Sequence, residues 1–487
     1  MSREIFVFDV GSTFTKLNLF CQEKDGTLRW IARTQAPTTV NDIMEGIAGA
    51  VAELSEAYRA SSLTGKTVLA SSSAAGGLRM VAIGYMPRVT AKAAKEVAMS
   101  AGARVLEVLS AEDPLEHRRQ VLKEIRPDII LLTGGTDGGD EESLLENAEM
   151  LAEMGLPAVV ILAGNASAQG KAEAILTAAN VKCRRVANVM PNIHELKVKP
   201  AREAIHQEFI RQITRAPGLR QLESLVTNGR VIPTPGAVLM GAELLARGYY
   251  GDKGIGSLVV VDLGGATTDV HSVIPELEEL TLEQRGLILT NEKQVSYRTV
   301  EGNLGLRVSC GGILESAGPH TILRYADLPV DDKNQEELNS YVKKVEVDTS
   351  HLAGNEKEKA FDRGLAVAAV EMALKRHAGF ISQEYDPVLG LAPGTPQGRD
   401  LRRVKHVVAV GGIFTVLPLE EARGILEEAL ARPGISLLPR QPRILIDRSY
   451  LLYAIGVLSQ LYPYQALRFA KDYFDLNEEE KGNAAYY

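Results

Sequence analysis

One short glycine-rich pattern occurs twice in this chain, far apart in the sequence. The first copy reads Phe-Asp-Val-Gly-Ser-Thr-Phe-Thr-Lys over residues 8–16, and the second reads Val-Asp-Leu-Gly-Gly-Ala-Thr-Thr-Asp over residues 261–269. In each copy an apolar run ends at an Asp, turns at glycine and continues with hydroxyl residues. This pattern predicts a strand, a tight turn and a second strand. Because internal repeats report architecture, the duplication favours a fold built from two related halves.

The residue types in the repeat are those of a phosphate-binding turn. Glycine lets backbone amides approach an anion, hydroxyls add donors, and a nearby carboxylate can hold a hydrated divalent cation. Asp9 is therefore the first candidate for organising Mg²⁺, with Ser12 and Thr13 donating to phosphate; the alternative is that Asp9 only caps its own turn. Lys16 either reaches a phosphate oxygen or is the outward residue of an amphipathic strand.

Bulk composition excludes several classes of protein. The 487 residues are enough for two or three domains, and 45% hydrophobic residues with a net charge of −8 indicate a soluble globular protein without a basic surface for nucleic acid. Apolar runs fall short of the roughly 18–20 residues of a membrane span, and no signal peptide is visible. Cys21, Cys183 and Cys310 are too scattered for a disulfide framework or a zinc site. We expect a cytoplasmic protein with no membrane partner.

The elements expected along the chain suggest an interrupted, duplicated domain. Regular alternation of strands and helices between about 86 and 200 predicts a parallel sheet, which we interpret as a Rossmann-like β/α region inserted into the first half. The expected segments are a first half at 1–85, the β/α region at 86–200, a linker with a helix at 201–256, a second half at 257–465 with a variable subdomain at about 320–400, and a tail at 466–487.

Three further segments give the pattern a resemblance to the actin, sugar kinase and heat-shock chaperone ATPase superfamily. Residues 232–242 are similar to its first connecting helix, 408–415 to its adenosine motif and 453–458 to its second connecting helix, and all five motifs come in the expected order. The resemblance implies two duplicated actin-like (ribonuclease H-like) α/β domains around ATP and Mg²⁺. It implies that Asp262 orients or deprotonates the attacking water or holds the metal. The residues that it assigns to the nucleotide are Gly11, Ser12, Thr13, Lys16, Gly264, Gly265, Thr267, Gly411 and Gly412.

Some features depart from that pattern or compete with it. The chaperones carry an acidic residue before the proline of the first connecting motif, where this chain has Val231 and Ile232; Glu243, one turn further along, is the candidate substitute. The loop at 133–139, Thr-Gly-Gly-Thr-Asp-Gly-Gly, either nests an anion at a helix N-terminus or only lets a strand enter a helix. Asp269 is either part of the site or structural, and His271 is interpreted as a strand residue.

Over most of its length the chain resembles the MutL/GlmL-type accessory proteins of adenosylcobalamin-dependent glutamate mutase and related aminomutases, which are unrelated to DNA mismatch repair. The resemblance rests on residues 8–16, 131–139 and 260–270. It implies a slow Mg²⁺-dependent ATPase that acts as a reactivating chaperone and exchanges damaged cobalamin in a mutase, with a homodimer left open. Two alternatives share the fold: a small-molecule kinase and a nucleotide-dependent scaffold or filament protein.

Overall fold

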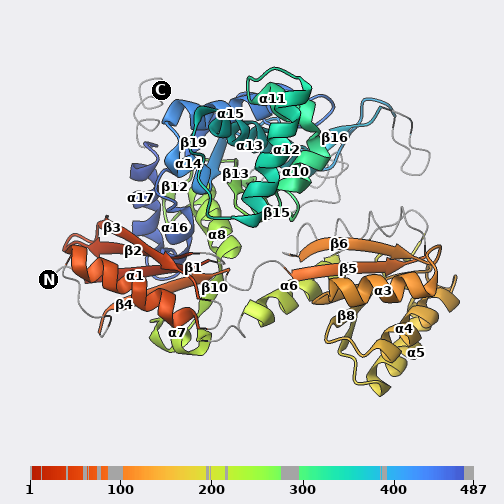
Figure 1. The fold of residues 1–487 in the computed structure, drawn as a ribbon. Coiled ribbons are helices and arrows are strands. Elements are labelled where there is room, and N and C mark those ends of the chain that lie inside the picture. Colours follow the sequence, from red (N-terminus) through yellow and green to blue (C-terminus); the bar gives the residue numbers. More distant parts are fainter. Residues whose placement is uncertain are drawn as a thin grey trace. The chain divides into compact units, whose positions relative to one another are not determined.

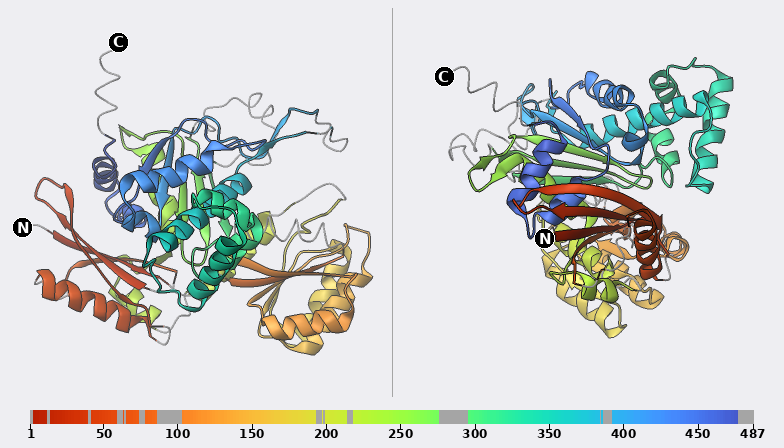
Figure 2. Two further views of the ribbon diagram at one scale, coloured as in Figure 1. Left: turned by 45° about the horizontal axis from the view of Figure 1, so that its top comes forward. Right: turned by 90° about the vertical axis from the view of Figure 1, so that its left-hand side faces the viewer.

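The structure is a computed structural model (Figures 1 and 2), and the chain divides into two compact units. Unit 1 consists of Met1–Gly76, Ile213–Arg298 and Asn303–Tyr487, and unit 2 of Gly77–Gln212 with Thr299–Gly302. The β/α region that the sequence predicts at 86–200 falls within the range of unit 2. The structure describes residues 3–11, 14–39, 42–58, 63, 65–73, 78–85, 103–192, 197, 199–213, 218–275, 295–383, 385 and 392–476.

The first sheet of unit 1 has the strand order β10-β4-β1-β2-β3, in which β1 is antiparallel to β2 and parallel to β4. Side chains of β1 alternate between two cores, as the period of two requires: Phe6 and Phe8 pack against helix α1, while Ile5 and Val7 join a second core. The elements are β1 (Arg3–Val10), β2 (Phe14–Gln22), β3 (Leu28–Pro37), α1 (Ile43–Tyr58), β4 (Thr67–Ser72), α7 (Leu219–Leu225) and β10 (Val231–Pro233).

The second sheet repeats this topology. Its order is β15-β14-β13-β18-β19, and β13 is antiparallel to β14 and parallel to β18. Each central strand therefore begins a hairpin on one side and pairs with a parallel strand on the other, which confirms the predicted duplicated actin-like α/β fold. The strands are β13 (Leu258–Leu263), β14 (Thr268–Val273), β15 (Ser296–Glu301), β18 (His406–Val410) and β19 (Arg443–Ile446), with short hairpins β11 (Gly248–Tyr249), β12 (Asp252–Lys253), β16 (Phe380–Ile381) and β17 (Pro396–Gln397).

Helices α8 (Thr234–Arg247) and α16 (Leu452–Leu458) follow the last strand of each sheet and cross closely. A Cβ on Gly456 would lie 1.8 Å from the Ala237 carbonyl oxygen, and one on Gly241 would lie 2.5 Å from that of Leu452. Glycine is therefore needed at both positions, as expected for the connecting helices. The next helix, α17 (Pro463–Tyr473), buries Leu467 and Ala470, so the tail predicted from residue 466 includes part of a packed helix.

Further helices cover the second sheet. Within the variable subdomain expected at about 320–400, α12 packs on α13 through one apolar face that carries Leu338 and Val342. The helices are α10 (Cys310–Ala317), α11 (Pro319–Tyr325), α12 (Asp332–Val347), α13 (Glu356–His377), α14 (Gly412–Val416) and α15 (Leu419–Ala431). No helix among the described residues is long and apolar enough to cross a bilayer.

Unit 2 contains a parallel sheet of order β6-β5-β7-β8-β9, which confirms the sheet predicted from the alternation of strands and helices. Its central strands β7 and β8 are buried on both faces, since their residues are almost entirely aliphatic. The elements are β5 (Leu78–Gly84), β6 (Ala103–Ser110), α3 (Leu115–Ile125), β7 (Ile129–Leu132), α4 (Glu142–Met154), β8 (Val159–Leu162), α5 (Ala166–Ala178) and β9 (Cys183–Arg185), and α6 (Lys199–Ile213) leads out of it.

Candidate functional site

The two glycine-rich repeats form two hairpins with the same backbone. The Gly11 N–H donates to the Phe14 carbonyl at 3.0 Å, and the Gly264 N–H donates to the Thr267 carbonyl at 2.9 Å. The strand-end aspartates occupy matching positions, because Asp9 lies opposite Lys16 across its hairpin. Asp262 lies opposite Asp269. The predicted phosphate ligands Ser12 and Thr13 lie outside the described residues.

Asp9 is buried, with 1% of its surface exposed, and three side chains donate to its carboxylate. Thr234 Oγ1 at the start of α8 lies 2.6 Å from Oδ1, and Ser71 Oγ of β4 lies 3.2 Å from the same atom. Lys16 Nζ lies 3.3 Å from Oδ2 and 3.8 Å from the centre of the Tyr450 ring. The Lys16 side chain is 20% exposed and turned toward Asp9, so it is not the outward residue of its strand. Asp9 thus links β2, β4 and the start of α8.

Asp262 sits in a different electrostatic environment. Burial raises the pKa of its carboxyl to about 7, and the negative charge of Asp269 acts in the same direction. The charges of Asp9 and Asp447 raise this pKa further, whereas that of Lys16 lowers it. No side chain in the described part of the chain donates a hydrogen bond to Asp262. A carboxyl with a pKa near neutrality is suited to accept a proton from water.

Asp269 itself is compensated by Arg298. The Arg298 Nε and Nη2 atoms lie 2.9 and 2.5 Å from Asp269 Oδ1, and Thr267 Oγ1 donates to Oδ2 at 3.2 Å. The negative charge that faces Asp262 is therefore held in place by an arginine of β15.

The turn of the second hairpin presents a row of backbone donors. The carbonyls of Gly264 and Gly265 accept from residues 306–308, and the Ala266 carbonyl accepts from Ser309 Oγ. Because a trans peptide points its N–H away from its C=O, the N–H groups of Gly265, Ala266 and Thr267 face the opposite side. Within the described residues no backbone carbonyl accepts from them. Consecutive free amides of this kind form an anion-binding concavity.

The predicted adenosine motif lies against this hairpin. Gly411 follows β18 with φ +131°, and a Cβ there would lie 2.2 Å from the Leu263 carbonyl oxygen. A Cβ on Gly412 would meet nothing within 4 Å. The strand end is therefore packed at Gly411 and open at Gly412, which leaves backbone accessible beside the second turn.

The donor chemistry at the two hairpins fits Mg²⁺, a hard cation that proteins hold through one or two carboxylates with water and phosphate oxygens. Asp9 and Asp262 supply such carboxylates. The negative charges that raise the pKa of Asp262 would also favour a cation bound beside it. Among the described residues there is no cluster of three or more His, Cys, Asp or Glu side chains placed to bind a metal. The residues thus fit a metal that arrives with a phosphate ligand rather than an all-protein cage.

Sequence reasoning missed several residues of this region. Asp447 is fully buried after β19 and accepts from the Leu451 and Leu452 N–H groups and the Tyr473 hydroxyl, each at 2.8 Å. The sequence did carry a signal for Asp447, because this residue, like Asp9 and Asp262, stands at the end of an apolar strand. Thr234 and Tyr450 had no such signal, since each meets the first hairpin only through the fold.

Other candidates are accounted for by local structure. In the 133–139 loop, Asp137 Oδ1 accepts from the Ala166 N–H and from Asn188, and Asn165 Oδ1 accepts from the Gly138 N–H. These contacts favour the structural interpretation of the loop. Burial raises the pKa of the Cys310 thiol to about 12, which disfavours a reactive thiolate. His271 is a strand residue of β14, as predicted.

Glu243, the proposed substitute for the missing acidic residue, lies on α8. Its carboxylate accepts a hydrogen bond from Ser296 Oγ of β15. It is therefore engaged within unit 1, whereas Val231 and Ile232 pair with β4 as strand β10.

The solved structures that resemble this chain do so only loosely. Among solved structures, a diol dehydratase-reactivating factor in nucleotide-free form aligns over 94% of this chain and 100% of its own, with TM-score 0.37 and 12% identity. A gluconate kinase from Lactobacillus acidophilus aligns over 98% and 92%, with TM-score 0.32 and 11% identity. Superpositions this loose carry no argument.

The sequence comparisons are closer. The family model described as MutL protein matches residues 5–474. "Protein MutL" of Clostridium tetanomorphum is 40% identical over 475 residues, which cover 96% of this chain and 98% of the relative. This chain therefore belongs to the MutL protein family.

Proposed function

We propose that this protein binds and slowly hydrolyses ATP with Mg²⁺ and uses that cycle as a reactivating chaperone for an adenosylcobalamin-dependent amino acid mutase. The observation that carries the nucleotide part is the pair of matching hairpins, each with a carboxylate at its strand end, in two halves joined by crossing helices. The amides of the second turn supply donors for phosphate without any side-chain charge.

The roles that we propose follow from the environment of each group. Asp9 holds hydrated Mg²⁺, since its carboxylate is fixed by Thr234 and Ser71. Asp262 orients the attacking water and accepts its proton, because its raised pKa makes it basic near neutrality. Mg²⁺, when bound, neutralises phosphate charge. Gly11, Ser12, Thr13, Lys16, Gly264, Gly265 and Thr267 contact phosphate, and Gly411 with Gly412 lies under the adenosine.

The partner part of the proposal rests on family membership. The 40% identical relative is named MutL, and the resemblance of this family to accessory proteins of glutamate mutase supplies the mutase. In the cycle that we propose, ATP closes the two halves of unit 1 about the α8–α16 crossing, hydrolysis releases them, and the mutase is opened so that damaged cobalamin exchanges. A ligand shifts such an equilibrium only by the difference in its affinity for the two states.

The test is Mg²⁺-dependent ATP hydrolysis by the wild type, Asp9→Asn and Asp262→Asn, with and without a mutase inactivated by damaged cobalamin. We expect the mutase to stimulate hydrolysis and either substitution to abolish the stimulation. Asp25→Asn, at an exposed turn after β2, is the matched control and should behave as wild type. The absence of ATP binding under every condition would make both hairpins purely structural.

The same assay separates the alternatives. Stimulation by a small metabolite with phosphate transfer to it, rather than by a protein, would identify a kinase. An increase in light scattering with ATP and Mg²⁺ would identify a filament-forming scaffold. Stimulation by the inactivated mutase alone supports the chaperone.

A further inference from the structure

The segment between β15 and α10 packs closely against the turn of the second hairpin, residues 264–267, which we call the second phosphate turn. Arg307 and Val308 both donate backbone N–H bonds to the Gly265 carbonyl at 2.8 Å. A Cβ on Gly305 would lie 2.3 Å from the carbonyl carbon of Ala266, so only glycine permits this approach. The position of residues 305–309 therefore fixes the shape of the turn whose amides face away from it.

The side chain of Arg307 ties this segment to a distant helix. Its Nη1 and Nη2 atoms donate to the two oxygens of Asp362 on α13 at 3.0 and 2.9 Å, and Nε donates to the His351 carbonyl at 3.2 Å. Asp362 is 9% exposed, so this bidentate pair is shielded from water. Bidentate arginine–carboxylate pairs are geometrically strict, and a displacement of one partner is passed to the other.

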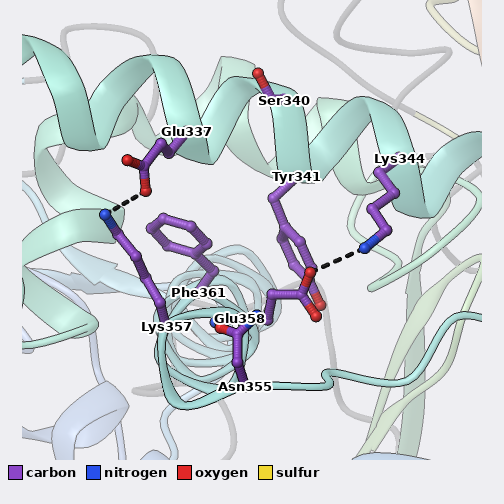
Figure 3. Close-up of a pocket in the computed structure, with 8 residues that line it drawn as sticks. All are labelled: Glu337, Ser340, Tyr341, Lys344, Asn355, Lys357, Glu358 and Phe361. Carbon is purple, nitrogen blue, oxygen red and sulfur yellow. Dashed lines mark hydrogen bonds and ion pairs between the residues drawn. The ribbon is translucent and has the colours of Figure 1, made fainter.

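Asp362 also accepts from the Tyr341 hydroxyl of α12 at 2.9 Å. Figure 3 shows Tyr341 and Phe361 lining a pocket between α12 and the start of α13. The volume of this pocket is about 290 Å³. Two ion pairs span it, Glu337–Lys357 and Lys344–Glu358. The phosphate turn, Arg307, Asp362 and the pocket thus form one continuous chain of contacts.

We propose that Arg307 is a positioning residue that couples phosphate at the second turn to the arrangement of the α12–α13 pocket. This proposal rests on the proposed ATP binding and adds its regulation. Coupling between two sites is reciprocal, so a change at α12–α13 that displaces Asp362 should in turn weaken phosphate binding at the second turn.

The test combines ATP affinity with hydrogen–deuterium exchange of α12 and residues 348–362 in the full-length protein, with and without Mg²⁺ and a non-hydrolysable ATP analogue. In the wild type we expect the analogue to slow exchange there. Arg307→Lys keeps the charge but loses the bidentate contact, so it should weaken analogue binding about tenfold and remove the protection. Tyr341→Phe removes only the hydroxyl contact, and should leave affinity within about threefold while reducing protection of α12.

The control is Arg363→Lys, the next residue on α13, whose guanidinium pairs with Asp327 and Glu428 rather than with Asp362. It should retain the wild-type affinity and protection. Analogue binding by the wild type without any change in exchange of α12–α13 would overturn the coupling alone. No analogue binding by the wild type would instead remove the proposed function and the coupling with it. If Arg307→Lys does not fold, the hydrogen–deuterium exchange of Tyr341→Phe tests the coupling: unchanged protection of α12 in this variant would overturn it.

Discussion

The two hairpins of unit 1 share a backbone and differ in charge. Across the first hairpin Asp9 faces Lys16, and across the second Asp262 faces Asp269. The first carboxylate is buried and held by three donors, whereas the pKa of the second is raised to about 7 by burial and neighbouring acids. Duplication has thus supplied two equivalent scaffolds, and the residues around each strand-end aspartate differ: three side-chain donors hold the first carboxylate, whereas burial and neighbouring acids raise the pKa of the second.

The largest expected effect tests this division of roles. Asp262→Asn should lower kcat for ATP hydrolysis by about 100-fold or more, with little change in KM, because general-base groups contribute factors of this order. Asp9→Asn should act mainly on the Mg²⁺ concentration that gives half-maximal rate. Steady-state kinetics over a Mg²⁺ titration measures both. Identical kinetic profiles for the two variants would show that the hairpins are not differentiated.

The turns themselves are expected to differ in their tolerance of a side chain. A Cβ on Gly11 would lie 2.7 Å from the Phe14 carbonyl oxygen, while one on Gly264 would lie 3.0 Å from that of Thr267. We expect Gly11→Ala to lower the free energy of unfolding by about 1–3 kcal/mol, as overpacking does, and Gly264→Ala to cost less. Urea unfolding of both variants checks the order. A larger loss for Gly264→Ala would mean that the second turn is the more tightly built.

A third difference between the hairpins lies on their second strands, two residues after Lys16 in the first and two residues after Asp269 in the second. Asn18 donates to the Tyr453 hydroxyl at 2.7 Å and accepts from Trp30 at 3.0 Å. At the matching place both ring nitrogens of His271 are buried without a hydrogen-bond partner in the described part of the chain. Burial, assisted by the charge of Arg298, lowers the pKa of His271 to about 3, while Asp269 acts in the opposite direction.

The sign of the resulting pH dependence follows from proton binding. Below the unfolded pKa of 6.5 the unfolded chain binds a proton that the folded state refuses, so stability is present above pH 6.5 and is lost as the pH falls toward 3. When the pH falls from 7.5 to 5.5, His271 should lower the free energy of unfolding by about 1.4 kcal/mol. Urea unfolding at both values should show a smaller loss for His271→Leu than for wild type. Equal losses in the two proteins would mean that His271 is protonated when folded.

Much of the fold was predictable because it follows from local pattern. The alternation of apolar residues fixed the strands, the glycine repeat predicted two hairpins, and the β/α alternation of unit 2 predicted its parallel sheet. Asp9 and Asp262 were found by the same logic, since both end an apolar strand. These are properties of neighbouring residues, and they require no knowledge of the distant chain.

The contacts that distinguish the hairpins were not predictable in this way. Thr234 reaches Asp9 from a helix 225 residues away in sequence, and Arg298 and Arg307 meet carboxylates on other elements. Nothing in the local pattern of such residues separates an ion pair from a solvated surface charge. The two hairpins could therefore be identified from sequence, whereas their different environments required the structure.

The smallest expected effect concerns Lys16, the cation of the first hairpin, which pairs with Asp9. Lys16 Nζ lies 3.8 Å from the centre of the Tyr450 ring, and Tyr450 adopts φ +53°, a conformation that favours glycine or asparagine. Tyr450→Phe and Tyr450→Leu share this backbone cost, so a comparison of the two isolates the ring. In a double-mutant cycle with Lys16→Gln, read by urea unfolding, we expect Tyr450→Leu to show a coupling of about 0.5–1 kcal/mol and Tyr450→Phe to show almost none. A coupling near zero for Tyr450→Leu would mean that Asp9 alone holds Lys16 in the first hairpin, and the difference between the hairpins would then reduce to their cross-strand pairs.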